Sequence, residues 1–78
     1  MAKLYLLSPS EILLLRKLKS AELKQSRIAA DICKLELSNE STLTRKTIDR
    51  IETGDKAWSI DSEIIYVETI KKHKLKTA

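Results

Sequence analysis

Three long cationic side chains, Arg45, Lys46 and Arg50, stand within one short stretch, LTRKTIDRIETG (residues 43–54). At about 100° per residue around a helix, Lys46 and Arg50 project away from the two isoleucines of this stretch, and Arg45 lies in its first turn. Guanidinium and ammonium groups bind phosphate and can donate hydrogen bonds to guanine N7 and O6. A solvated helix face carries the same residue types, so composition alone leaves both roles open.

Local signals predict a helix over residues 45–53 that would hold these cations. Thr44 has the side chain of an N-cap, and Leu43 and Ile48 occupy the positions of a hydrophobic staple. Gly54 fits the left-handed position that follows many helix ends. The stretch is therefore expected to be a short helix with one apolar face and one cationic face.

Three further helices are expected around it, which predicts an all-α bundle of four to five helices with a helix-turn-helix. The first begins after Ser8, with Glu11 as its capping partner, and runs from Pro9 to about Ser20. The second is predicted within residues 23–37, and the fourth begins near Ser59 or Asp61 and ends near residue 70. The apolar residues expected to be buried are Ile12, Leu15 and part of Leu14 or Leu18, then Ile28, Ile32, Cys33 and Leu35, then Ile60, Ile64, Val67 and Ile70.

The 78 residues are expected to form a single domain, with an apolar arm or strand over residues 1–7, a helical core over 8–70 and a basic tail over 71–78. The net charge of +4 is weak evidence of function, because residues 1–70 hold eleven basic and eleven acidic side chains. One cysteine and no long apolar run favour a cytoplasmic protein without a membrane segment. No catalytic or metal-ligand pattern is evident, so we expect no enzyme activity, no cofactor and no metal.

The order of residues in two stretches, QSRIAADI and LTRKTIDRIETG, resembles the Cro and phage-repressor (Xre-like) helix-turn-helix family. That family follows the pattern Q-x-x-[LI]-A-x-x-[LI], a turn, then [VL]-[ST]-x-x-[ST]-[IL]-x-x-[IYW]-E-x-G. The resemblance covers roughly residues 10–70. The matching residues are Gln25, Ile28, Ala29 and Ile32, followed by Leu43, Thr44, Thr47, Ile48, Ile51, Glu52 and Gly54.

The resemblance implies a phage or prophage repressor that acts in the cytoplasm of a bacterial host and binds operator DNA as a homodimer. Gln25 would contact phosphate, Thr44 the DNA backbone, Thr47 the backbone or a thymine methyl, and the three cations of residues 45–53 the base edges. It also implies a structural ion pair between Arg16 and Glu52. The residues themselves add Arg27 and Lys56 as candidate phosphate contacts, with a solvated role left open for each.

Three features favour an alternative, a helix-turn-helix protein that binds another repressor as a modulator or antirepressor. One is the near-zero net charge of residues 1–70. Residues 34–42 stand as an insertion between the two halves of the family pattern, where relatives have a tight turn. Asp49 places a negative charge on the cationic face, where it could accept from cytosine N4, hold a neighbouring arginine or weaken DNA binding.

Overall fold

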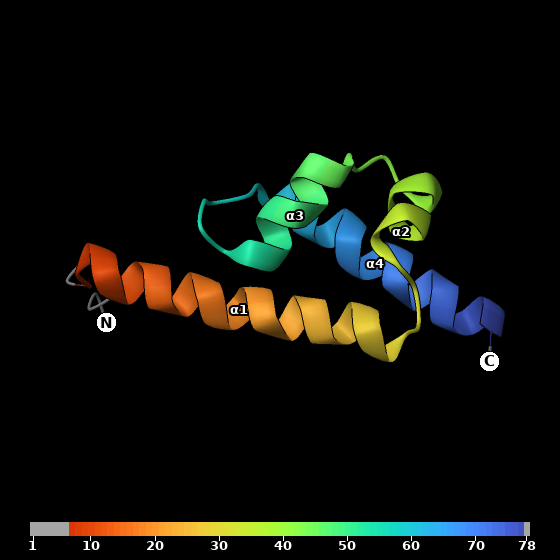
Figure 1. Ribbon diagram of the computed structural model, residues 1–78, viewed down its shortest axis with the longest axis horizontal. Coiled ribbons are helices and arrows are strands. Elements are labelled where there is room, and N and C mark those ends of the chain that lie inside the picture. Colours follow the sequence, from red (N-terminus) through yellow and green to blue (C-terminus); the bar gives the residue numbers. More distant parts are fainter. Residues whose placement is uncertain (1–6, 78) are drawn as a thin grey trace.

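The computed structural model describes residues 7–77, which form an all-α fold without strands. The chain forms four helices: α1 (Pro9–Ala29), α2 (Lys34–Glu40), α3 (Arg45–Thr53) and α4 (Ile60–Thr77). The long α1 lies along one side, α3 and α4 pack against it, and α2 packs against α3 and α4 (Figure 1). The predicted all-α bundle is confirmed, whereas residues 1–6 of the predicted arm lie outside the described part of the chain.

The helix α1 occupies the region where two helices were predicted. No Gly or Pro lies between Pro9 and Ala30, and the presumed break near residues 21–22 holds Ala and Glu, which are strong helix formers. The chain turns instead after Ala29, where Asp31 has a φ of 58°. Asp is one of the few non-glycine residues that adopt this left-handed conformation. The predicted helix over residues 23–37 is therefore wrong.

The residues predicted as an insertion form α2 and a turn over residues 41–44. Cys33 caps α2: its Sγ accepts from the Glu36 amide at 3.5 Å, and Glu36 Oε1 accepts from the Cys33 amide at 3.2 Å. This arrangement is a capping box, with sulfur in place of the usual hydroxyl. Cys33 is consequently exposed, which corrects the prediction that it is buried.

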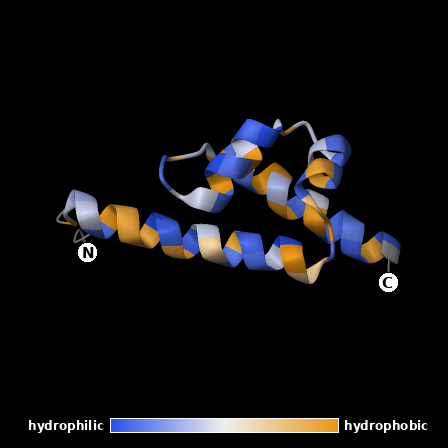
Figure 2. Ribbon diagram, in the orientation of Figure 1, coloured by the Kyte–Doolittle hydropathy of each residue, from blue (hydrophilic) through white to orange (hydrophobic). Residues whose placement is uncertain are grey.

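The hydrophobic core gathers where α1, α2, α3 and α4 meet, and it contains fewer of the predicted residues than expected. Ile48, Ile51 and Ile70 are buried as predicted, and Trp58 packs against the core. The leucine-rich first half of α1 extends past the other helices, so its apolar side chains remain exposed (Figure 2). The predicted core residues that are exposed are Ile12, Leu15, Ile28, Cys33, Leu35, Ile60 and Ile64. Ile32 is also buried as predicted, and the core is completed by Leu23, Ala30, Leu37, Leu43 and Tyr66.

The lysine-rich end of the chain is helical, because α4 continues to Thr77. The predicted boundary at residue 70 is therefore wrong. His73 Nδ1 lies 3.3 Å from Glu40 Oε2 and so links α4 to α2. The Ser59 side chain accepts from the Ser62 amide at 3.1 Å, which makes Ser59 the cap of α4.

Candidate nucleic-acid interface

The helix α3 is held at both ends by the predicted caps. Thr44 Oγ1 accepts from the Thr47 amide at 3.2 Å, and Gly54 has a φ of 71° while its amide donates to the Arg50 carbonyl. Ile48 and Ile51 are completely buried, which fixes the rotation of α3 about its axis. The opposite side of the helix is thereby directed to solvent.

A buried polar junction fixes α3 against α1 and α4. Arg27 Nε and Nη2 donate to the two carboxylate oxygens of Glu52 at 2.6 and 3.1 Å. The Tyr66 hydroxyl of α4 lies 2.7 Å from the same carboxylate and 3.0 Å from the Leu23 carbonyl. Because the Glu52 carboxylate is almost fully buried, the hydrogen bonds from Arg27 and Tyr66 replace the hydration that it has lost.

This junction corrects two predictions. Glu52 pairs with Arg27, whereas Arg16 donates to the Asp55 carbonyl at 3.4 Å, so the predicted pair of Arg16 with Glu52 is wrong. The Arg27 side chain is only 11% exposed and also donates to the Ile32 carbonyl. Its donors are thus directed inside the domain, and Arg27 belongs to the architecture rather than to a phosphate-binding surface.

The junction also shifts two pKa values. The hydrogen bond to Glu52 raises the pKa of Arg27, so the guanidinium stays charged. Burial, with a smaller contribution from the carboxylate, raises the pKa of Tyr66 above its ordinary value. The phenol therefore remains a hydrogen-bond donor when the pH rises, and α3 keeps its position.

The acidic side chains near α3 are engaged inside the molecule. Asp49 Oδ1 accepts from Lys34 Nζ of α2 at 2.9 Å, and this hydrogen bond lowers the pKa of the Asp49 carboxyl. Asp55 pairs with Lys17 of α1 at 3.1 Å. Glu36, Glu40 and Glu52 are likewise held by contacts described above. All five carboxylates of residues 34–56 thus have partners within the chain.

The cations on the outer side of α3 lack such partners. Within residues 7–77, none of Arg45, Lys46, Arg50 and Lys56 makes an ion pair within 4.0 Å, and all four are exposed. Three of them share one surface hollow, which is lined by Lys46, Asp49, Arg50, Thr53, Asp55 and Lys56. The structure therefore groups the cations that the sequence predicted, with Thr44 exposed and Thr47 half-buried beside them.

Gln25 does not join this group. It lies within α1 instead of at a helix start, at about 140° to 160° around the helix axis from the buried residues Ser20, Leu23 and Arg27. These three residues face the rest of the domain, so Gln25 faces away from α3. The phosphate contact predicted for it has no geometric basis.

Sequence reasoning missed Lys34, the first residue of α2, which lies beside α3 through its contact with Asp49. Its signal was available: Cys33 and Glu36 stand at the spacing of a capping box, three residues apart. Reading that cap would have started a helix at Lys34. Lys34 then becomes a candidate member of the surface around α3.

Comparison of the chain with protein-family models, curated proteins and solved structures gave no match. Within the described residues, none of the helices is long and apolar enough to cross a membrane. The same part of the chain has no group of three or more His, Cys, Asp or Glu residues suited to a metal ion. The functional assignment therefore depends on the geometry of α2 and α3.

Proposed function

We propose that this protein is a sequence-specific DNA-binding transcriptional regulator of the helix-turn-helix class, with α3 inserted in the major groove. One observation carries the proposal: the carboxylates around α3 are occupied within the chain, whereas Arg45, Lys46, Arg50 and Lys56 remain open to a ligand. Long donors near the N-terminus of an exposed helix suit contacts with base edges. Lys56, in the turn after α3, suits a phosphate.

The position of α2 supports the proposal in a second way. Counted on α2, the first half of the family pattern falls on Lys34, Leu37, Ser38 and Ser41, directly before the turn that leads to Leu43. The two halves of the family pattern then follow each other without an insertion, although Leu37 is the one residue of these four that has the type the pattern requires. Lys34 takes the place of the glutamine, where a cation suits contact with the DNA backbone.

Two arguments for the alternative, a protein that binds another repressor, lose their basis in this arrangement. The supposed insertion is α2 with its turn, and Asp49 is held by Lys34 rather than left as a free charge on the DNA-facing side. A protein partner is still favoured by the near-zero net charge of residues 1–70 and by the exposed apolar surface of α1. That surface lies apart from the cationic side of α3.

The test is selection of duplexes from a random pool, followed by titration of the selected duplex and a scrambled one at two salt concentrations. The triple variant R45A/K46A/R50A should lose the preference for the selected duplex, by about 1–3 kcal/mol for each base contact removed. The control K24A/K71A/K72A removes the same charge from exposed sites on α1 and α4. This control should weaken binding to both duplexes alike, or leave it unchanged.

Three outcomes contradict the proposal. In the first, the pool yields no preferred sequence; in the second, the two triple variants behave alike; in the third, binding vanishes at the higher salt for every duplex. In the last case the attraction is only electrostatic. Retained binding of a repressor protein by R45A/K46A/R50A would instead identify the alternative function.

A further inference from the structure

The side of α1 that faces away from the domain carries a coiled-coil pattern. Five residues along this side are separated by four, three, four and three positions, which is the heptad spacing of the contact line, or seam, between two helices of a coiled coil. At about 100° per residue, all five lie within about 80° of arc. They are Leu14, Leu18, Ala21, Gln25 and Ile28, and every one is exposed.

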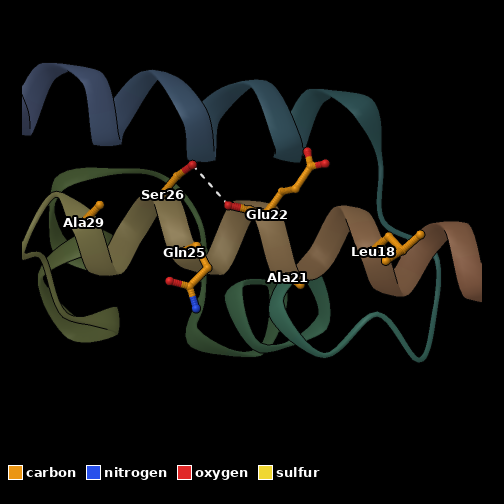
Figure 3. Close-up of a pocket in the computed structure, with 6 residues that line it drawn as sticks. All are labelled: Leu18, Ala21, Glu22, Gln25, Ser26 and Ala29. Atoms are coloured by element: carbon orange, nitrogen blue, oxygen red, sulfur yellow. Dashed lines mark hydrogen bonds between the residues drawn. The ribbon is translucent and has the colours of Figure 1, made fainter.

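The exposure of this seam is not explained by packing within the chain. Leu14, Leu18 and Ile28 are 60%, 55% and 49% exposed, although each is a large apolar side chain. The seam passes through a surface hollow that is lined by Leu18, Ala21, Glu22, Gln25, Ser26 and Ala29 (Figure 3). Contiguous apolar surface of this kind on a small domain marks a contact site.

The charges beside the seam indicate which partner fits it. Lys17 flanks the seam on one side and Glu22 on the other, five residues later, which is the spacing of an ion pair between parallel helices. In a parallel pair of α1 helices, Lys17 of each copy lies near Glu22 of the other, so Lys17 exchanges its contact with Asp55 of its own chain for one with the partner copy. An antiparallel pair would instead bring Lys17 close to Lys24 and place Gln25 opposite Leu14.

Gln25 supports the same arrangement. A parallel pair of identical helices places Gln25 against Gln25, where the two amides can hydrogen-bond to each other. A single polar residue at such a position fixes the register and orientation of the helices, at some expense of stability. The seam is therefore self-complementary in its apolar, polar and charged residues.

We propose that a second copy of this chain docks on the Leu14–Ile28 face of α1 and forms a parallel, two-fold symmetric helix pair. The surface lies on the side of α1 away from α3, so the cations of α3 remain uncovered. The proposal is independent of DNA binding, and its test needs no DNA. Because the seam contains only two heptads, the dimer should dissociate on dilution.

Sedimentation equilibrium over a range of protein concentrations tests the seam. The unmodified chain should approach twice the monomer mass as its concentration rises. Leu18→Glu should weaken the dimer at least about a hundredfold, because the symmetric pair loses two buried leucines. The matched control is Leu35→Glu on α2, since Leu35 is exposed to the same 55%. Circular dichroism checks that both variants keep their helices.

The orientation is tested by disulfide formation in a Cys33→Ser background, which removes the native thiol while retaining a capping hydroxyl. Gln25→Cys should form a disulfide-linked dimer under mild oxidation, whereas Asn39→Cys on α2 should not. A chain that stays monomeric at every concentration, or a dimer broken equally by Leu18→Glu and Leu35→Glu, overturns the proposal. A dimer in which Gln25→Cys fails to crosslink overturns the parallel arrangement.

Discussion

Replacing Arg27 by Ala tests the junction that fixes α3. The change leaves the Glu52 carboxylate, whose side chain is 2% exposed, without the guanidinium that donates at 2.6 and 3.1 Å. Breaking a buried ion pair from one side costs about 3–5 kcal/mol. The Tyr66 hydroxyl still donates to Glu52, so we expect a loss near the lower figure. A domain of this length has about 4–12 kcal/mol in total, so the loss amounts to roughly a quarter to three quarters of its stability.

The assay is urea denaturation at neutral pH, followed by the fluorescence of Trp58, which packs against the core, and by far-ultraviolet circular dichroism. Arg16→Ala is the matched control, because it removes the same side chain about three turns earlier on α1 and loses only a 3.4 Å hydrogen bond to the Asp55 carbonyl. That control should lose less than about 1 kcal/mol. The double variant R27M/E52Q removes both charges and should recover part of the loss.

The reasoning fails if Arg16→Ala destabilises the protein more than Arg27→Ala. That result would mean that Arg16 is the partner of Glu52, as the family resemblance implied. It also fails if R27M/E52Q is no more stable than Arg27→Ala, because the penalty would then not come from an unpaired buried charge.

Two further changes test the packing around α3. Gly54→Ala should destabilise the domain by about 2 kcal/mol or more, because Gly54 has a φ of 71° and an added Cβ would lie 2.7 Å from Ser20 Oγ. A decrease of less than about 0.5 kcal/mol in the free energy of unfolding, measured by urea denaturation, would contradict this. Tyr66→Phe tests the raised pKa of the phenol. The unfolded chain releases the phenol proton from about pH 10, whereas the native state releases it only at a higher pH. The stability of the native protein should therefore fall as the pH rises above about 10. The Phe variant should lose this part of the alkaline slope, and an unchanged slope would show that Tyr66 does not cause it.

The sequence predicted α3 and its cations well because their signals are local. Thr44 and Gly54 mark the two ends of the helix within ten residues, and the positions of Ile48 and Ile51 decide which side is exposed. The sequence also identified the cap of α1 at Ser8, where the amide and side chain both bond Glu11. None of these features depends on a distant part of the chain.

The boundaries of α1 and α2 were not predictable in the same way. The expected break near residue 21 came from fitting a family pattern, and no residue there interrupts a helix. Pairing Glu52 with Arg27 instead of Arg16 depends on how far α1 is displaced along α3, and helical periodicity gives no information on that displacement. Ile12 and Leu15 were assigned to the core from their apolar type and helical spacing, yet both are exposed.

The unsupported first half of α1 has a consequence for local motion. Hydrogen bonds from its capping residues stay within residues 8–11, and the first side-chain hydrogen bond from the described part of α1 to a distant part of the chain is that of Arg16 to the Asp55 carbonyl. Amide protons from Ile12 to Leu15 therefore need only local fraying to exchange with solvent, whereas those of Ile48 and Ile51 need global unfolding. In one molecule, the exchange rates should fall along α1 from its start toward Leu23. The steepness of this gradient in exchange rates shows how far along α1 the packing of the other helices stabilises the helix.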